Sequence, residues 1–194
     1  MGTSDVLETA CVYLKSGKVI SYPTEAVWGI GCDPFNEIAV SRVLDLKKRQ
    51  ISKGLILVAA NLEQISALVQ PLKDEQIALL KSSWPGPTTW LIPDELDCFP
   101  SWIKGQYDSV AIRVSDHEVI RGLCLKFGGP IVSTSANVAG KPEIKDRKRI
   151  EDVFGDSIDF VVDGELGNKH STSCLLYTSP SPRDRTRSRM PSSA

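Results

Sequence analysis

Apolar positions follow a helical period in some stretches of the chain, and these stretches predict its helices. From Ser4, apolar residues recur on one helical face until Gly17 ends the pattern. A second helix is expected after Asn36, whose short polar side chain suits a cap, and it runs to the Lys47 region. Two further helical stretches begin at Asn61 and Lys73, and one more is expected from Asp116 to Phe127.

Strands are predicted where short β-rich or continuous apolar runs replace that period. Every residue of Gly54–Ala60 is apolar, which is typical of a strand buried on both faces. We interpret residues 23–34 as a loop that follows the first strand. The expected strands are Lys18–Tyr22, Gly54–Ala60, Thr88–Ile92, Ser109–Val114, Pro130–Ser133 and Ile158–Val162. The alternation predicts one α/β (α+β-like) domain with a twisted mixed sheet flanked by helices.

Composition narrows the class of protein to an ordinary globular domain. The chain has 194 residues, of which 41% are hydrophobic and 24% are charged. No apolar run approaches the length of a membrane span, so we expect no membrane association. The five cysteines form no C-x-x-C pair, and there are only two histidines. We therefore expect no metal site, no disulfide framework and a cytoplasmic location.

The last 21 residues differ in composition from the rest of the chain. Residues 174–194 are rich in Ser, Pro and Arg, and four arginines against one aspartate give +3. The formal charge of the whole chain is -1, so residues 1–173 carry −4. Both CLLYTSPSPRD and SRMPSSA back-translate to sequences that resemble adapters of transposon-based sequencing libraries. We expect a catalytic domain over residues 1–173, truncated at its C-terminal end, and a non-native, disordered tail over residues 174–194.

Two segments carry candidate chemistry in the first third of the chain. The run from Tyr22 to Gly31 passes through a Pro turn into a glycine-rich loop, which exposes backbone N–H groups and the Thr24 hydroxyl. A tight surface turn explains this run equally well. Four cations follow between Lys47 and Lys53, at a helix end before the buried strand. They favour either compensation of the helix dipole or a polyphosphate clamp in which Arg49 binds bidentately.

Two more segments lie at strands in the second half. Arg113 interrupts the apolar strand Ser109–Val114, and it requires an anionic partner, which is either a ligand or an internal salt bridge. The strand Pro130–Ser133 ends in small hydrogen-bonding residues up to Asn137. These residues favour either a ligand site at a strand end or a simple helix cap. A glycine-rich phosphate loop with lysine and a complete dinucleotide motif are both missing from the sequence.

Taken together, these segments resemble the YrdC/TsaC family, the threonylcarbamoyl-AMP synthases. The similar blocks are YPTEA-WGIGCDP, LKKR with KGLILVAAN, WPGPTT, S-AIRV-DH and P-VSTSAN-AG, and they occur in the family's order between Ser4 and Ser173. The family signature K-x-R followed by S-x-N is matched by Lys47, Arg49, Ser135 and Asn137. The resemblance implies a YrdC-like domain with a concave basic face for substrates.

The resemblance also implies an activity and a role for each matched residue. L-threonine, bicarbonate and ATP would give threonylcarbamoyl-AMP and pyrophosphate, a nucleotidyl transfer that serves threonylcarbamoyladenosine modification of tRNA. A separate threonylcarbamoyl-transferase complex would complete that modification. Mg²⁺ would arrive with ATP, and neither DNA nor a protein-held metal is expected. The implied catalytic residues are Lys47, Arg49, Ser135 and Asn137, the ATP site adds Lys53 and Ser109, and the threonine site comprises Thr24, Arg113, Ser133 and Ser173.

Two other functions compete with this interpretation. A non-catalytic RNA-binding protein would also use a basic concave face, although the −4 charge of residues 1–173 argues against general RNA binding. A carbamoyl-transfer domain of hydrogenase maturation shares the expected fold, but it normally lies in a longer chain with zinc-finger cysteines. The strand at Leu57 and Val58 lacks the histidine of longer relatives and resembles short-form members.

Overall fold

The computed structural model describes residues 3–167 and 174–177, in which helices and strands alternate as the sequence predicts. The α-helices in these ranges are α1 (Thr3–Lys15), α2 (Glu37–Lys47), α3 (Ser66–Val69), α4 (Asp74–Ser83), α5 (Ser101–Lys104), α6 (Glu118–Phe127) and α7 (Arg147–Phe154). The 3-10 helices are η1 (Ile51–Lys53), η2 (Glu63–Ile65) and η3 (Gly155–Ser157). The strands are β1 (Ile20–Pro23), β2 (Trp28–Gly31), β3 (Ile56–Ala59), β4 (Thr88–Pro93), β5 (Ser109–Val114), β6 (Ile131–Val132), β7 (Thr134–Ser135), β8 (Phe160–Val161) and β9 (Cys174–Tyr177).

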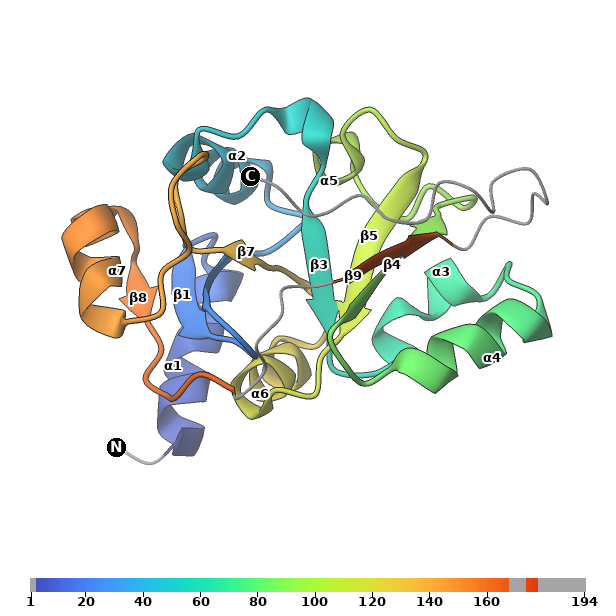
Figure 1. Cartoon of the computed structure of the whole chain (residues 1–194), viewed down its shortest axis with the longest axis horizontal. Helices are drawn as coiled ribbons and strands as arrows, with labels where there is room; N and C mark the ends of the chain where they lie inside the picture. Colours follow the sequence, from blue (N-terminus) through green and yellow to red (C-terminus); the bar gives the residue numbers. More distant parts are fainter. Residues whose placement is uncertain (1–2, 168–173, 178–194) are drawn as a thin grey trace.

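The strands form two mixed sheets rather than one (Figure 1). The smaller sheet has the order β7-β2-β1-β8, and the larger has the order β6-β3-β5-β4-β9. In the larger sheet β3 and β5 run parallel, with Val58 opposite Arg113, while β6 pairs antiparallel with β3. The expected mixed α/β architecture is confirmed, and the single sheet is corrected to two.

One short segment joins the two sheets. Ile131 and Val132 pair with β3 of the larger sheet, whereas Thr134 and Ser135 pair with β2 of the smaller sheet. Ser133 lies at the crossing, where its backbone N–H donates to the Ile56 carbonyl at 2.9 Å. The strand predicted over residues 130–133 is therefore shortened to β6, and the chain continues into β7 of the other sheet. We call residues 131–135 the crossing segment.

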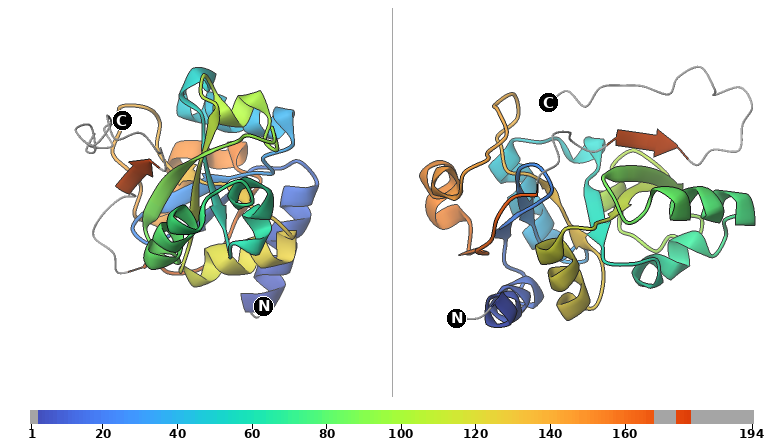
Figure 2. Two further views of the ribbon diagram at one scale, coloured as in Figure 1. Left: turned by 90° about the vertical axis from the view of Figure 1, so that its right-hand side faces the viewer. Right: turned by 60° about the horizontal axis from the view of Figure 1, so that its bottom comes forward.

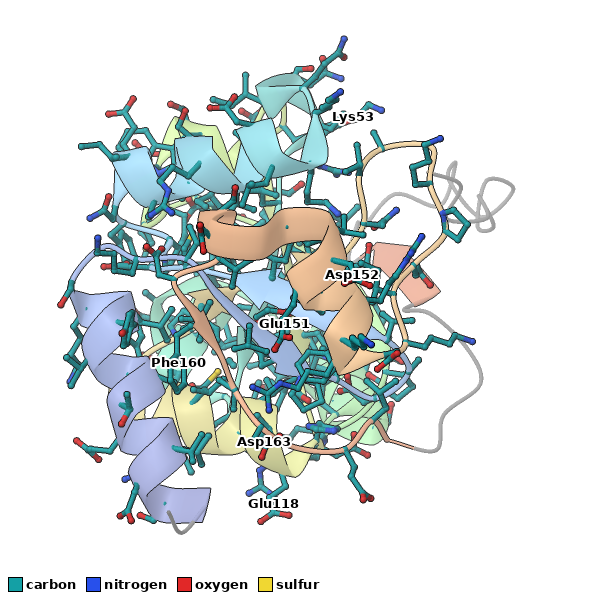
Figure 3. All side chains as sticks on the ribbon, turned by 90° about the vertical axis from the view of Figure 1, so that its left-hand side faces the viewer. Lys53, Glu118, Glu151, Asp152, Phe160 and Asp163 are labelled. Atoms are coloured by element: carbon teal, nitrogen blue, oxygen red, sulfur yellow. The ribbon has the colours of Figure 1, made fainter. Side chains whose placement is uncertain are left out.

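The apolar residues form two clusters that hold the sheets in place. The larger cluster surrounds the middle of β3 and β5, where Leu57 and Ile112 are fully buried. The second cluster lies between α1, α6 and β1, and it includes the fully buried Tyr22. Phe160 extends this layer because its ring stacks on Tyr13 of α1, with 5.1 Å between the ring centroids (Figure 3). Burial of Leu57, Val58 and Ala59 confirms the interpretation of this apolar run, while Ile56 at the start of β3 is partly exposed.

Helix α2 ends in a turn that orients the basic segment. The Asn36 side chain caps its start by accepting a hydrogen bond from the Ala39 N–H at 3.0 Å, as predicted. At the other end, Lys48 adopts a left-handed conformation with φ 50°, and its N–H donates to the Asp45 carbonyl. The chain therefore leaves the helix abruptly directly after Lys47.

Three sequence predictions need correction. Residues 23–34 contain β2 as well as a loop, because Trp28–Gly31 complete a hairpin with β1. The cap of α6 is His117 and not Asp116, one residue later than expected. Helix α7 was not predicted at all.

The expectation that residues 174–194 lack structure also needs correction for the first four of them. Cys174–Tyr177 form β9, which pairs parallel with β4 from Thr88 to Leu91 and lies at the outer edge of the larger sheet (Figure 2). An apolar Leu-Leu-Tyr run has the β propensity needed to cover an open strand edge. Residues 178–194 lie outside the described residues, and the foreign origin of the segment stays a prediction.

Candidate active site

A cavity of about 680 Å³ opens where the crossing segment passes between the sheets. This volume lies within the range of small-molecule and cofactor sites. Its walls come from the turn between β1 and β2, the end of α2 with the residues after it, the crossing segment and the loop at residues 139–143. Arg113 of β5 completes the lining. The geometry therefore gathers the four segments that the sequence singled out.

The lining of this cavity is strongly cationic. The acidic residues in it are Glu25 and Glu143. The cationic residues are Lys47, Lys48, Arg49, Lys53, Arg113 and Lys141. Six cations facing two carboxylates favour an anionic ligand, because the low-dielectric walls of a cavity strengthen the local field.

Lys47 is the most enclosed of the cations at the end of α2. Its side chain reaches the S-x-N segment, where the ammonium donates to the Asn137 carbonyl at 2.9 Å, to Asn137 Oδ1 at 3.2 Å and to the Ser135 carbonyl. The pKa of Lys47 is lowered to about 8, mainly by burial and to a lesser extent by the nearby Arg49 charge, while Glu143 acts in the opposite direction. Lys47 therefore connects the K-x-R and S-x-N motifs directly.

Arg49 and Lys53 follow Lys47 in the chain, after the turn at Lys48. The Arg49 Nε donates to the Gly54 carbonyl at 3.2 Å, and Arg49 lines the cavity. Burial lowers the pKa of Arg49 from its ordinary value. Lys53 is exposed at the end of η1, high on the molecule in Figure 3. The arrangement presents cations at graded depths, from buried Lys47 to exposed Lys53.

Ser135 and Asn137 form a small neutral network beside Lys47. The Ser135 hydroxyl donates to Asn137 Oδ1 at 2.7 Å, and the Asn137 amide donates to the Lys141 carbonyl at 2.8 Å. The Ala139 N–H in turn donates to the Lys47 carbonyl at 2.9 Å. These bonds hold the loop at residues 139–143 over the end of α2 and form one wall of the cavity.

The residues expected to bind threonine lie on another wall. The Thr24 hydroxyl donates to the Val27 carbonyl at 2.7 Å, so the tight-turn interpretation is also correct, and its lone pairs remain available as acceptors. Arg113 forms a salt bridge with Glu25, with 3.2 Å between Nη2 and Oε2. The internal salt bridge considered from the sequence therefore exists, and Arg113 lines the cavity as well. Ser133 is buried at the crossing beside them.

Among the predicted site residues that the structure describes, Ser109 is not brought to the cavity. Ser109 begins β5 and lies opposite Pro93, four residues along the strand from Arg113. At about 3.3 Å per residue that separation is about 13 Å, and Ser109 is not part of the lining. Ser173 lies outside the described residues.

The sequence interpretation missed several residues that line the cavity. Glu25 was quoted within YPTEA without a role, although a carboxylate beside a buried arginine is the signal that could have identified it. The loop at residues 139–143 follows the S-x-N motif and could have been included by proximity alone. Within the described residues, no group of three or more His, Cys, Asp or Glu side chains could hold a metal ion. No helix in that part of the chain is long and apolar enough to cross a bilayer.

Comparison with known proteins places this geometry in a family. The Sua5/YciO/YrdC family model, described as "Telomere recombination", matches residues 12–185. A threonylcarbamoyl-AMP synthase of Pseudomonas putida KT2440 is 47% identical over 175 residues, which cover 90% of this chain and 94% of that protein. The corresponding protein of Pseudomonas paraeruginosa PA7 is 48% identical over 168 residues, covering 87% of this chain and 90% of its own.

Solved structures support the same placement. Sua5 of P. abyssi, in complex with L-threonine, has a TM-score of 0.81 and 31% identity, covering 88% of this chain and 50% of its own. YciO of E. coli has a TM-score of 0.78 over 90% of this chain, and at 22% identity it supports the fold alone. The matched relatives and the shared fold show that this chain belongs to the Sua5/YciO/YrdC family.

Proposed function

We propose that the protein is a threonylcarbamoyl-AMP synthase, which converts L-threonine, bicarbonate and ATP to threonylcarbamoyl-AMP and pyrophosphate. The observation that carries this proposal is the cationic cavity in which Lys47 joins the K-x-R motif to the S-x-N motif. Relatives that are nearly half identical over most of their length bear this name. The reaction is a nucleotidyl transfer, because the adenylyl group moves to a carbamate oxygen.

The triphosphate of ATP occupies the basic part of the cavity in this proposal. Arg49 pairs with phosphate oxygens through its planar fork, and Lys47 and Lys53 add point charges. Ser135 and Asn137 orient the phosphate–ribose region by neutral hydrogen bonds. Mg²⁺ enters on the phosphates of ATP, because the two lining carboxylates are too few for a protein cage.

Threonine binds on the wall formed by Thr24, Arg113 and Ser133. Arg113 pairs with the carboxylate of the amino acid, and the two hydroxyl residues bind its polar atoms. Ser173, assigned to the same group by resemblance, lies outside the described residues and keeps this role as a prediction. This placement directs the threonine amine toward the phosphates.

The chemical steps need no nucleophile from the protein. Bicarbonate yields CO₂ when its C–OH bond breaks and hydroxide leaves. The threonine nitrogen forms a bond to the carbon of CO₂ and loses a proton, which converts the hydroxide to water, and a carbamate results. A carbamate oxygen then forms a bond to the α-phosphorus, and the bond from that phosphorus to the β-phosphate oxygen breaks, so pyrophosphate leaves with the electron pair. The cations stabilise the developing charge on pyrophosphate, and catalysis consists of positioning and electrostatics.

The product is a substrate for modification of tRNA by a separate threonylcarbamoyl-transferase complex, which implies a cytoplasmic location. Both competing functions lack a specific observation in their favour. The solved HypF chain bound to phosphate and nucleotide is only 17% identical and supports the fold alone. One assay separates all three possibilities.

The test is release of pyrophosphate from ATP, measured with and without L-threonine in bicarbonate buffer. The unchanged protein should release pyrophosphate only when threonine is present, and mass spectrometry should detect the threonylcarbamoyl-adenylate. The double variant Lys47→Ala/Arg49→Ala should fold yet lose this activity, whereas Lys81→Ala, which removes an exposed cation on α4, should keep it. Pyrophosphate release that does not depend on threonine, or a fully active double variant, would contradict the proposal.

A further inference from the structure

We propose that Glu25 is a positioning residue that orients the Arg113 guanidinium toward the carboxylate of the bound amino acid. This inference rests on the proposed function and adds a residue to its threonine site. Glu25 lies in the turn between β1 and β2 and lines the cavity beside Arg113. Both residues are buried, with exposed fractions of 4% and 8%. A buried pair at the wall of a substrate site fixes the direction of its arginine.

The two oxygens of the Glu25 carboxylate have different partners. Oε2 lies 3.2 Å from Arg113 Nη2, and Oε1 accepts a hydrogen bond from the Ser115 hydroxyl at 2.6 Å. The short second bond sets the rotation of the carboxylate. Arg113 lies near the end of β5, and Ser115 directly follows that strand. The Glu25 carboxylate contacts both residues and therefore holds the end of β5 against the β1–β2 turn.

Ser115 is itself fixed by the start of the next helix. Its hydroxyl oxygen accepts a hydrogen bond from the His117 N–H at 3.1 Å, and His117 caps α6. The connection therefore runs from a helix start through Ser115 and Glu25 to the guanidinium at the cavity wall. Glu25 lies in the turn between β1 and β2, and Ser115 lies in the short connection between β5 and α6.

The backbone of Glu25 is also enclosed from the other side. The Gly167 N–H donates to the Thr24 carbonyl at 2.9 Å. A Cβ at Gly167 would lie 2.8 Å from the Glu25 carbonyl oxygen, so this close approach requires glycine. The Glu25 side chain therefore has little freedom to leave Arg113.

Orientation and charge predict opposite effects of Glu25 on threonine binding. A carboxylate near the site repels the carboxylate of threonine, so its charge alone would weaken binding. Orientation strengthens binding, because a guanidinium that is already held in place loses less rotamer entropy when it pairs with a ligand carboxylate. We assign the dominant effect to orientation, because the carboxylate is anchored by Ser115 and does not act as a free charge.

The test compares Glu25→Gln and Ser115→Ala with the unchanged protein in the pyrophosphate assay. Glutamine keeps the shape and one acceptor but loses the negative charge that pairs with Arg113 and that strengthens the bond from the Ser115 hydroxyl. We expect each variant to raise the threonine KM about five- to tenfold and to leave the ATP KM within about twofold. L-threoninamide, which lacks the carboxylate, should be used about equally well by Glu25→Gln and by the unchanged protein.

The matched control is Asp159→Asn. Asp159 pairs with Arg42 at 2.9 Å, accepts a hydrogen bond from the Val19 N–H at 2.7 Å and is not part of the cavity lining. This variant should lower the melting temperature and leave both KM values unchanged, which separates lost stability from lost positioning.

A lower threonine KM in Glu25→Gln would overturn the inference, because it would mean that repulsion dominates. Equal changes in both KM values, or an effect limited to melting temperature, would also overturn it. Lack of threonine-dependent activity in the unchanged protein would instead refute the proposed function, so the two failures are distinguishable.

Discussion

At the scale of single residues, Lys47 combines burial with a positive charge that the proposed reaction needs. Its pKa of about 8 lies below the ordinary value of lysine because burial disfavours the ammonium. The unfolded chain therefore binds more protons than the folded chain between about pH 8 and pH 10. The free energy of unfolding that this group contributes is lowest below pH 8 and rises with pH across that window.

The same pKa predicts how binding of ATP depends on pH. As the pH rises through about 8, Lys47 loses its proton and the cavity loses one positive charge. The ATP KM should therefore increase steadily above this pH, while ATP KM values measured between pH 6.5 and 7.5 should be nearly constant. Lys47→Arg is the control, because arginine keeps its charge and should remove the rise even if activity is lower. An unchanged rise in Lys47→Arg would assign it to another group.

A second prediction at the scale of single residues concerns Arg113 and which of the two substrates it binds. Arg113→Lys keeps the charge but loses the planar fork that matches a carboxylate. The threonine KM should rise about tenfold, equivalent to about 1.4 kcal/mol, with a much smaller change for ATP. Steady-state kinetics with each substrate varied in turn measures both effects. Equal rises would place Arg113 against the nucleotide instead.

At the scale of elements, the crossing segment depends on a close approach at Gly31 of β2. A Cβ at this position would overlap the Val132 carbonyl oxygen and lie 2.7 Å from the Tyr22 hydroxyl. Gly31→Ala should therefore push β6 away, lower stability by about 1–3 kcal/mol and raise both KM values together. Gly129→Ala is the matched control, because nothing lies within 4 Å of a Cβ there. Denaturant unfolding measures the difference, and equal stability of the two variants would contradict the argument.

The elements also show what a sequence can and cannot predict. Strand β3 was identified correctly because its residues are all apolar and mostly buried, and β5 because Val110, Ile112 and Val114 alternate along it and are buried. Strand β2 was missed because two of its four residues are glycines, which indicate a turn when read locally. The division of residues 130–135 between two sheets depends on partners far away in sequence, and no local pattern encodes it.

The candidate site, too, could be predicted from the sequence only in part. The K-x-R and S-x-N motifs were predicted to meet through family resemblance, and the Lys47 bonds to Asn137 bring them together. An internal salt bridge of Arg113 remained one of two open alternatives, and its partner was not identified. Glu25 lies 88 positions earlier in the sequence, and only the fold brings it next to Arg113. Ser109 was assigned by resemblance, and its place at the far end of β5 follows from strand length.

At the scale of the whole molecule, charge is distributed unevenly. Residues 1–173 carry a formal charge of −4, yet the cavity lining has six cations and two carboxylates. The exterior therefore disfavours general binding of nucleic acid backbones while the cavity attracts a compact anion. This separation of charge suits a small phosphate-bearing substrate better than a long polyanion.

The outer edge of the larger sheet allows a final prediction about the last described strand. Strand β9 covers β4, with Thr88 opposite Cys174 and Leu91 opposite Tyr177. Truncation after residue 173 would leave the β4 edge with unpaired N–H and C=O groups, which promote pairing with other chains. We expect a lower melting temperature and self-association that grows with protein concentration, measured by differential scanning fluorimetry and light scattering. Truncation after Tyr177 is the control, because it keeps β9 and should preserve both properties. Self-association that is the same in the two truncated chains would show that β9 does not protect this edge.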